Sequence, residues 1–572
     1  MIQRKNTNNE VAVRVFALGG LDENGKNMYC IETVDSIFII EAGSKYPDLT
    51  NPGVDIIIPD MTYLKARANK IKAIIISHGH DDEYGALPYL LKLVNAPIYT
   101  TQTAKIFIMA DYGKKYGKKF DFHIIQPSSD VVIAGYRFQF FQTTHAVMES
   151  FGFSVETAAG NIVYTGDYIS DFGSTGHFRF DLNKVAEIAD EHNTLLMMCE
   201  STGAEKPGIA SPSHKITPHI KKLIEEGTGR AIIAAYSQNL YAINEIIALG
   251  IKNNKRICLA TNKFIDVLPQ FIANGDLIIP RANQCSINDL QKYDPNDVII
   301  LVTGQGEQLY DRIEDIARGE AKYSKYFQLT NADTIVLACP PVPTIEKRAT
   351  AAIDSLYKTG VNVINLNKES FSSMHAQEED IKMMVSLFKP KYYMPVEGDF
   401  RCMMANARVV QSIGYKSSQI FLMDNGVSLG FDAAGNSIPV NQLFKPGNVF
   451  VDGLGVGDVK SEIIDERNEM SEGGVVILGA TISSKQHKVL SKPNVQFRGF
   501  VYMKENKKIT DIVTKLFDKA LDSLVVQKNP DIINMTARLT ENIKRELRKA
   551  TGKRPLVRPL IIDMDAQTKE TI

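Results

Sequence analysis

One six-residue segment constrains the fold of this chain more than any other: His78-Gly79-His80-Asp81-Asp82-Glu83. It follows the apolar run 72–76, whose isoleucines indicate a short buried strand that ends at these polar residues. Two imidazoles and three carboxylates on one turn are nitrogen and oxygen ligands that divalent metals accept. An isolated His-x-His pair is weak evidence by itself, because most histidines bind no metal.

Two further polar side chains follow strand-like runs elsewhere in the chain. His145 ends the run 131–145, and Asp167 ends the run 161–167. If these strands end at one rim of a sheet, their terminal side chains converge, which a metal site requires. The two residues therefore strengthen the interpretation of the hexapeptide as part of a metal site.

The remaining patterns divide the chain into parts. Residues 11–20 alternate as a strand does, 27–43 predict a hairpin closing on Asp35 and Ser36, and 85–95 predict a helix. From about residue 206, helix and strand patterns alternate, which predicts a separate parallel α/β domain. Glycines cluster between Phe444 and Lys460 and indicate a linker. The last hundred residues combine strands with long helices and indicate a small α+β domain.

Composition excludes some classes of protein. With 572 residues, the chain is too long for a single core. No apolar run reaches the roughly 18 to 20 residues of a membrane helix, and residues 1–10 lack the apolar segment of a secretory signal. Six scattered cysteines without a Cys-x-x-Cys pair favour a reducing cytoplasm. We therefore expect a cytoplasmic protein of several domains that does not bind membranes.

Charge gives one local signal. The formal net charge of −1 is neutral evidence on nucleic-acid binding. Between Lys544 and Arg558, however, there are seven basic residues and only one acidic residue, Glu546. This run indicates either a solvated helix face or a patch that contacts phosphates.

Several longer motifs resemble one known family. Residues 77–91, 143–153, 161–167, 199–208 and 389–401 are similar, in order and spacing, to the successive motifs of the ribonuclease J family, in the β-CASP branch of the metallo-β-lactamase fold. The similarity extends from about Val13 to the C-terminus. It implies a metal-dependent ribonuclease that degrades RNA from 5′ to 3′ and also cuts internally, in mRNA decay and rRNA processing.

The resemblance also implies an architecture of the α/β class. A metallo-β-lactamase αββα sandwich is expected over residues 1–205 and 371–445, interrupted by a β-CASP α/β domain over 206–370. A linker over 446–461 and a small α+β C-terminal domain over 462–572 complete the expected chain.

Residue roles follow from the same resemblance. One metal is expected at His78, His80 and His145, and a second at Asp82, Glu83 and Glu397, with Asp167 bridging them. The expected catalytic residues are Asp82, Glu200 and His375. The expected phosphate-binding residues are Ser237, Gln238, Asn239, Phe371, Ser372, Ser373, Met374 and His375.

This chain departs from the family pattern at the second metal. The family has histidine at the positions of Glu83 and Glu397, so this site would hold only oxygen donors. Such a site suits Mn²⁺ best, with Zn²⁺ or Mg²⁺ as alternatives, and its converging carboxylates should have raised pKa values. Further departures occur at Glu41, Met374, Tyr241, Ala242 and the short loop 303–307. Together they are similar to the low-activity ribonuclease J paralogue that accompanies an active one in some bacteria.

Three functions are consistent with these features. The first is a ribonuclease weakened by its altered metal site. The second is a nearly inactive RNA-binding subunit of an active paralogue, and the third is a small-molecule hydrolase, which the inserted domain and His375 disfavour. The family resemblance implies homo-oligomers, dimers or tetramers, and hetero-oligomers with a paralogue. Apolar helix positions in the C-terminal domain, such as Ile512, Leu516 and Leu521, fill either an interface or that domain's own core.

Overall fold

The computed structural model describes residues 11–48, 50–191, 193–260, 262–322, 324–342, 344–453, 455–457, 461–500, 506–527 and 530–565. Residues 1–10, for which we expected no secretory signal, and part of the predicted linker are outside the described residues. The chain forms two compact units, Met1–Tyr46 with Ile56–Val449, and Pro47–Asp55 with Phe450–Ile572. Each unit is described by itself below.

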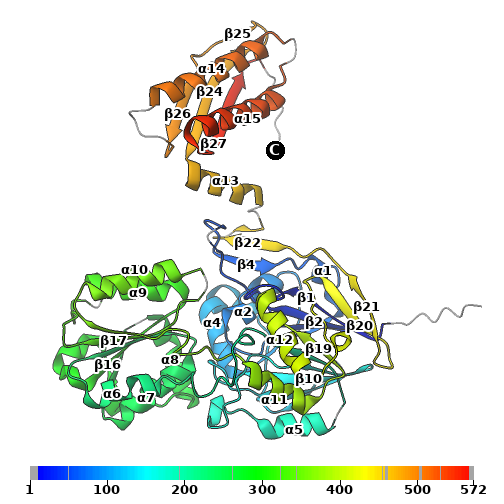
Figure 1. The fold of residues 1–572 in the computed structure, drawn as a ribbon, viewed down its shortest axis with the longest axis vertical. Helices are drawn as coiled ribbons and strands as arrows, with labels where there is room; N and C mark the ends of the chain where they lie inside the picture. The colour runs from blue at the N-terminus through cyan, green and yellow to red at the C-terminus, as the bar shows by residue number, and fades with distance from the viewer. Residues whose placement is uncertain are drawn as a thin grey trace, which may run out of the picture. The chain divides into compact units, whose positions relative to one another are not determined.

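Two sheets form the sandwich of the larger unit (Figure 1). The first has the order β21-β20-β1-β2-β3-β5-β6-β7, with bounds β1 (Val13–Gly19), β2 (Met28–Thr33), β3 (Ile37–Ile40), β5 (Ile71–Ile75), β6 (Ile98–Thr100), β7 (Phe122–Ile124), β20 (Val427–Phe431) and β21 (Ser437–Gln442). The second has the order β19-β12-β11-β10-β9-β8, with bounds β8 (Asp130–Ile133), β9 (Tyr136–Gln142), β10 (Phe151–Thr157), β11 (Gly160–Tyr164), β12 (Thr194–Cys199) and β19 (Tyr392–Pro395).

Apolar side chains from both sheets fill the space between them, including Val15, Phe38, Phe140, Phe153 and Leu196. The far side of the second sheet packs on α5 (Leu182–Glu191), α11 (Glu378–Phe388) and α12 (Phe400–Ser412). Strands β2 and β12 are buried along their whole length, because both faces of each strand are covered. The expected αββα sandwich is confirmed.

Most expected elements form, and two differ. The hairpin 27–43 closes as predicted, since the Ser36 carbonyl accepts a hydrogen bond from the Thr33 amide at 2.8 Å. The helix predicted over 85–95 is wrong in length, because only α3 (Leu87–Leu90) is helical there, after α2 (Asp81–Tyr84). The run 131–145 is not one strand but a hairpin of β8 and β9, turned at Ala134 and Gly135, both with positive φ. The other short elements are α1 (Thr62–Lys65) and β4 (Ile56–Pro59), and the longer α4 spans Gln102–Tyr116.

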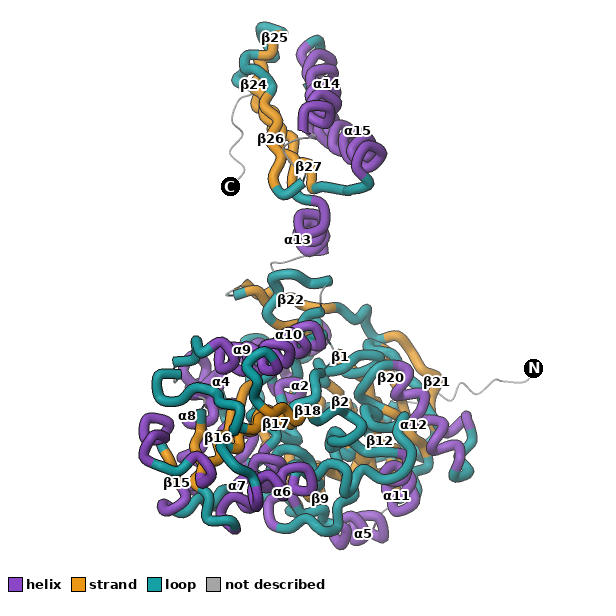
Figure 2. The backbone as a smooth tube through the Cα atoms, turned by 60° about the vertical axis from the view of Figure 1, so that its left-hand side comes forward, coloured by secondary structure: helices purple, strands orange, loops and turns teal. Residues whose placement is uncertain are grey.

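The inserted domain is built on a wholly parallel sheet of order β15-β14-β16-β13-β17-β18, as predicted. Helices lie on both faces of this sheet, with α6 and α7 on one side and α9 and α10 on the other (Figure 2). The bounds are α6 (Thr217–Glu226), β13 (Ala231–Tyr236), α7 (Leu240–Lys252), β14 (Arg256–Leu259), α8 (Asn262–Asn274), β15 (Gln284–Cys285), β16 (Val298–Gly304), α9 (Gly306–Arg318), β17 (Thr334–Ala338), α10 (Glu346–Tyr357) and β18 (Asn362–Asn365).

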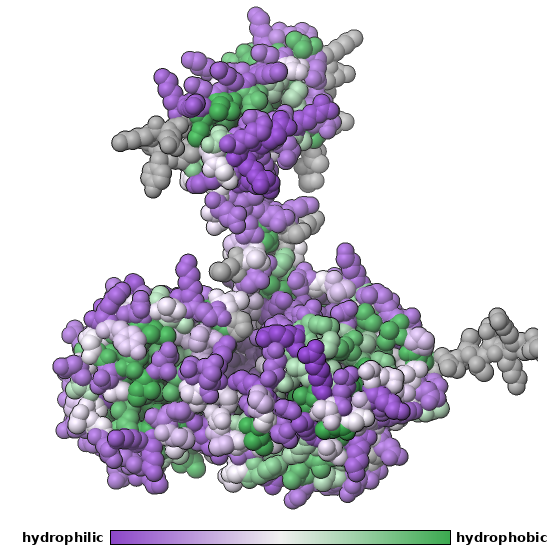
Figure 3. Space-filling view, viewed as in Figure 1, coloured by the Kyte–Doolittle hydropathy of each residue, from purple (hydrophilic) through white to green (hydrophobic). Residues whose placement is uncertain are grey.

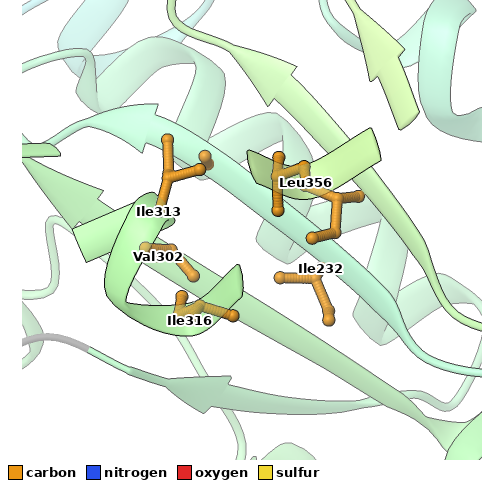
Figure 4. Close-up of a pocket in the computed structure, with 7 residues that line it drawn as sticks. Ile232, Val302, Ile313, Ile316 and Leu356 are labelled. Atoms are coloured by element: carbon orange, nitrogen blue, oxygen red, sulfur yellow. The ribbon is translucent and has the colours of Figure 1, made fainter. Parts of the chain in front are cut away.

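A small cavity of about 10 Å³ lies under α9 and α10 in this domain (Figure 4). Only apolar side chains line it, including Ile232, Val302, Ile313 and Leu356. A space of this size without polar partners does not hold an ordered water molecule, so it is a packing defect and not a ligand site.

The smaller unit holds a sheet in which β24 (Val475–Ser483) pairs with β26 (Asn494–Arg498), β25 (Lys488–Val489) and β27 (Leu556–Asp563). Helices α14 (Asn506–Val525) and α15 (Ile532–Thr551) cover one face. Leu521 is buried in this core and Leu516 packs against it, whereas Ile512 is half-buried, so Leu521 fills its own domain. Helix α13 (Ser461–Gly473) also belongs to this unit, and β22 (Asn448–Asp452) and β23 (Gly455–Val456) lie where we predicted the linker.

The face drawn in Figure 3 is largely hydrophilic, with apolar residues gathered in several patches. Among the described residues, no helix has the length and apolar character needed to cross a bilayer. The six cysteines are free thiols, five of them buried.

Candidate metal centre

The turn that carries the predicted ligands is held by the backbone of residues 42–44. The Ala42 amide donates to the Glu83 carbonyl at 2.6 Å, and the Ser44 amide donates to the Asp81 carbonyl at 3.0 Å. A Cβ atom on Gly43 would come within 1.5 Å of the Asp82 carbonyl oxygen, so only glycine fits there. These contacts fix α2 at the end of β5, where the sequence predicted the site.

Three imidazoles converge at this rim. His78 Nε2 lies 3.0 Å from His80 Nδ1, which lies 3.3 Å from His145 Nε2. His78 is held from behind by Ser77 Oγ, 2.9 Å from its Nδ1, and the Met374 carbonyl accepts a hydrogen bond from His145 Nδ1 at 2.8 Å. These outer partners fix the ring orientations and leave the inner nitrogens facing one another.

Asp167 completes a fourfold set of ligand atoms. Its Oδ2 lies 3.7 Å from His78 Nε2 and 3.5 Å from His145 Nε2. A metal about 2.0–2.1 Å from four tetrahedral ligands would separate them by about 3.3 Å, close to the observed spacings. The buried Oδ1 of Asp167 has no hydrogen-bond partner among the described residues, as expected of an atom that a cation would satisfy. The residues present therefore fit a divalent metal.

Carboxylates make up the other half of the centre. Glu83 accepts a hydrogen bond from Asn27 Nδ2 at 2.8 Å through Oε1. Its Oε2 has no hydrogen-bond partner among the described residues and lies 3.4 Å from His78 Nε2. Glu83 thus points an unsatisfied oxygen at the imidazoles, and its ligand atoms group with those of His80 and Asp82.

Glu397 belongs to a neighbouring group with Asp167, Glu200 and His375. Thr202 Oγ1 donates to Glu397 Oε1 at 2.8 Å, and His375 Nδ1 lies 2.8 Å from Glu200 Oε2. The structure therefore brings Asp167 next to both halves. The other three predicted ligands of the second metal are divided between two groups. Asp82 and Glu83 lie with His80, and Glu397 lies with Glu200 and His375.

Burial and crowding shift the pKa values of this cluster. Burial, and then the neighbouring imidazoles, holds the pKa values of His78 and His145 well below the usual range, and burial lowers that of His80 to about 4. Burial also raises the pKa of Glu397 to about 7, with Glu200 adding repulsion, and raises those of Glu83 and Asp167 well above the usual range. The expected rise in carboxylate pKa values is present.

His375 differs from the other three histidines. Burial lowers its pKa, but the charge and hydrogen bond of Glu200, together with the charges of Glu397 and Asp82, outweigh burial, and the pKa rises to about 9. At neutral pH this ring is a cation whose Nδ1 is held by Glu200. About 19% of its side chain is exposed, so the ring remains accessible from solvent.

The predicted phosphate-binding residues have varied surroundings. Gln238 Nε2 donates to the Gly79 carbonyl at 3.0 Å, which links the inserted domain to the metal-binding turn. Asn239 accepts from the Ala242 amide and caps α7, so its oxygen is used locally. Of the others, Ser373 is exposed, whereas Ser237, Phe371, Ser372 and Met374 are buried.

The remaining departures also have partners. Glu41 has φ of +60° and accepts two contacts from the Ser77 amide at 3.1 and 3.3 Å, while burial raises its pKa to about 8. Tyr241 reaches Asp171 at 3.2 Å, and Ala242 is buried in α7. In the segment 303–307, only Gln305 lies between the end of β16 at Gly304 and the start of α9 at Gly306.

Sequence reasoning missed three supporting side chains, Asn27, Ser77 and Thr202. None of these side chains is a metal-binding group at the end of a strand. Asn27 and Thr202 have partners that are distant in sequence, whereas Ser77 contacts the adjacent His78. Only the fold shows that Asn27 faces Glu83 and that Thr202 faces Glu397.

Known proteins match the whole chain. The metallo-beta-lactamase superfamily matches residues 21–197, the ribonuclease J beta-CASP domain matches 228–356, and the ribonuclease J C-terminal domain matches 462–564. Ribonuclease J2 of Bacillus subtilis is 30% identical over 98% of this chain and 100% of its own length. Ribonuclease J 2 of Staphylococcus epidermidis is 29% identical over 99% and 100%. A solved structure of a protein of unknown function from Enterococcus faecalis has a TM-score of 0.50 at 16% identity, covering 73% of this chain and all of its own, and supports the fold alone.

Fold and site together define a metallo-β-lactamase-type protein with a β-CASP insertion, whose fold binds divalent metals. The chain belongs to the ribonuclease J family, a family of ribonucleases, and has all three of its domains.

Proposed function

We propose that this protein hydrolyses RNA phosphodiester bonds slowly, by 5′–3′ exonucleolytic and internal cleavage, with up to two divalent metals and a preference for Mn²⁺. The observation that carries the proposal is the complete set His78, His80, His145 and Asp167, with the carboxylates of Asp82, Glu83 and Glu397 in the two adjoining groups. When bound, the metals supply a hydroxide nucleophile and neutralise charge on the scissile phosphate.

The side chains themselves contribute binding and proton transfer. His375 is held by Glu200 through Nδ1, and its raised pKa keeps it protonated at neutral pH. Its free ring nitrogen then donates a hydrogen bond to a phosphate oxygen and can deliver a proton to the leaving oxygen. Glu200 also accepts from the amides of Tyr168 and Ala376, both at 2.9 Å, so the ring's position is fixed before RNA binds.

The weakness of the enzyme follows from its carboxylate half. Glu83 and Glu397 have raised pKa values, so at neutral pH each is at least partly protonated without metal. A metal must displace those protons, which reduces its affinity. Oxygen donors also favour Mn²⁺ over Zn²⁺.

The test is cleavage of a 5′-labelled RNA by metal-depleted protein supplied with Mn²⁺, Mg²⁺ or Zn²⁺, alongside metal analysis. We expect the fastest cleavage with Mn²⁺. Equal or faster cleavage with Zn²⁺ alone would contradict the ligand argument. No cleavage with any metal, together with tight RNA binding, would instead favour the RNA-binding subunit.

We further propose that the protein works in the cytoplasm as an oligomer, as a homodimer or homotetramer or with a ribonuclease J paralogue. An apolar strip on the uncovered face of the C-terminal sheet supports this. Leu560, Ile562 and Met564 are 60%, 49% and 66% exposed, and Ile477 on the adjacent β24 is 40% exposed. Large exposed apolar groups of this kind mark interaction surfaces.

The double variant Leu560→Asp with Ile562→Asp tests this surface. Its mass is measured by light scattering, alone and mixed with the paralogue. We expect a smaller mass than for the unchanged chain. The control is Ile533→Asp, since Ile533 is 82% exposed on α15, a helix that covers the opposite face. A chain that is monomeric at micromolar concentration, alone and mixed, would remove the oligomer proposal.

A further inference from the structure

The C-terminal end of helix α4 carries an unusual concentration of positive charge. Lys114, Lys115, Lys118 and Lys119 lie within six residues, and all four are exposed. Lys92 is exposed as well and lies 5.6 Å from the centre of the Tyr116 ring. Because the whole chain has a net charge of only −1, this concentration is a local feature and not a general one.

In the part of the chain that the structure describes, these lysines have no acidic partner. Among the described residues, no carboxylate forms an ion pair with any of Lys92, Lys114, Lys115, Lys118 or Lys119. The nearby Asp111 accepts a hydrogen bond from the Tyr84 hydroxyl at 2.7 Å, and Asp121 lies 3.5 Å from His123.

The basic run near the C-terminus provides a contrast. There Lys544 pairs with Glu469 of α13 at 2.7 Å, and Arg558 pairs with Glu466 of the same helix. Lys549 pairs with Glu546 at 2.9 Å. Part of that positive charge is compensated by acids of the same domain, whereas the α4 lysines have no such partner among the described residues.

Aromatic rings lie among the α4 lysines. Lys115 Nζ is 5.2 Å from the centre of the half-buried Tyr116 ring, and Lys105 Nζ is 5.6 Å from that of Phe122. Phe120 contacts Phe122, with ring centres 5.4 Å apart. Positive charge that tracks a backbone, combined with rings on which bases stack, is how proteins bind single-stranded nucleic acid without reading its sequence.

Helix capping does not account for the patch. Lys114 and Lys115 lie in the last turn of α4 and stabilise the helix dipole. That effect ends within the last turn of α4, whereas Lys118 and Lys119 lie in the following 3-10 helix Gly117–Lys119 and Lys92 lies on another segment. The dipole of α4 therefore does not account for these three lysines.

Helix α4 also connects the patch to the metal centre. A Cβ on Gly79 would lie 3.3 Å from Ala104 Cα, so the N-terminal part of α4 adjoins the His78–His80 turn. The Tyr112 hydroxyl donates to the Gly85 carbonyl at 3.2 Å, one turn before the lysines. From Ala104 to Lys115, the helix rises about 17 Å. At about 3.4 Å per stacked nucleotide, this distance equals about five nucleotides.

We propose that Lys92, Lys114, Lys115, Lys118 and Lys119, with Tyr116, form a binding surface for the single-stranded part of an RNA whose scissile bond lies at the metal centre. This inference rests on the proposed function. It predicts that RNA gains affinity from nucleotides beyond about the fifth from the metal centre.

The test uses full-length protein in EDTA, so that no cleavage occurs, with fluorescein-labelled oligouridines of 5 and 15 nucleotides. We expect K114A/K115A/K118A/K119A to bind the 15-mer at least tenfold more weakly at 100 mM salt and the 5-mer unchanged. The slope of log affinity against log salt should fall by about 0.7 for each lost phosphate contact.

The matched control is K221A/K222A/K322A/K325A, which removes four exposed lysines of the inserted domain. It should leave both affinities within about twofold. Tyr116→Ala should weaken 15-mer binding by about fivefold or more, and Tyr116→Phe should restore it, because phenylalanine retains the stacking face. Thermal melting checks that each variant is folded.

A folded quadruple α4 variant with unchanged 15-mer affinity and salt slope would overturn the proposal, as would an equal loss for both oligomers. If the surface instead binds an acidic protein, the quadruple variant should bind the 15-mer as tightly as the unchanged protein does. If the unchanged protein binds the 15-mer through this surface yet cleaves no RNA with any metal, the nuclease proposal fails. The proposal that this surface binds RNA would still hold.

Discussion

The two halves of the metal centre are supported in different ways. Two imidazoles in the first half are fixed by outer contacts, Ser77 Oγ on His78 and the Met374 carbonyl on His145. In the second half, Glu83 and Glu397 depend on single side-chain donors, Asn27 and Thr202. Neutral imidazoles are ready to bind a metal, whereas partly protonated carboxylates must first lose a proton. The histidine half should therefore contribute most to metal binding, and removal of one of its ligands should cost more activity than removal of one carboxylate.

Removing one ligand from each half gives the largest expected effect. His145→Ala should lower RNA cleavage by more than about 100-fold and reduce bound metal, because it breaks the tetrahedral set. Glu397→Gln should lower cleavage by about tenfold or less. Metal analysis by mass spectrometry with cleavage rates in Mn²⁺ measures both. Equal losses in the two variants would show that the halves do not differ.

Making the second half resemble the first should have the next largest effect. Glu83→His with Glu397→His places two imidazoles among the carboxylates and removes two groups with raised pKa values. We expect cleavage in Zn²⁺ to rise by about tenfold or more, and by less in either single variant. Unchanged cleavage in the double variant would place the limit in the phosphate pocket.

A smaller effect is expected from the donor to Glu83. Asn27→Ala leaves Glu83 Oε1 without its hydrogen bond, which raises the carboxyl pKa further and disfavours metal binding. Mn²⁺ affinity should fall by about tenfold, the lower limit for outer-shell partners. Titration calorimetry measures it, and Thr202→Ala provides the equivalent change at Glu397. An unchanged affinity in Asn27→Ala would mean that Glu83 is not a ligand.

The smallest effect concerns pH and metal-free stability. Glu397 and Glu41 have pKa values of about 7 and 8 when folded, against 4.5 ordinarily, so the folded chain binds more protons and stability falls as pH rises through this range. His375, with a pKa of about 9, contributes stability that is complete below about pH 6.5 and is lost as pH rises through 9. We expect the melting temperature to fall by about 5 °C between pH 6.5 and 9.

Two controls accompany that measurement. Mn²⁺ should reduce the fall, because it binds the ionised carboxylates. Below pH 6.5 the fall in stability with rising pH should be shallower, since His80 has a pKa of about 4 and gains a proton on unfolding, which opposes the contribution of the carboxylates. A melting temperature that rises from pH 6.5 to 9 without metal would contradict the shifted pKa values.

The sequence predicted the histidine half better than the carboxylate half. His78, His80, His145 and Asp167 each follow a strand, so strand order and direction sufficed to predict their convergence. The grouping of Glu83 with Asp82, and of Glu397 with Glu200 and His375, depends on side-chain directions in loops that no periodicity encodes.

Local sequence patterns predicted the fold of the inserted domain but not the helix length over 85–95. The parallel sheet of the inserted domain was predictable because helix and strand patterns alternate there. The helix over 85–95 was not. Tyr84 and Ala86 at the start of this segment are buried, and tertiary packing there outweighs the local pattern.

Strand pairing in the sandwich also sets an order of events during synthesis. Strand β12 lies beside β19, with Leu196 paired to Tyr392, and β1 lies beside β20, with Val13 paired to Phe431. At about 5–20 residues per second, a ribosome needs on the order of 10–40 s between making the two members of the first pair. During that interval the β12 edge that later pairs with β19 has no neighbour, and before its end the inserted domain has gained every strand of its own sheet. The insertion should therefore fold first, and a nascent chain stalled near residue 370 should show a protease-resistant insertion beside an open, chaperone-dependent half-sandwich.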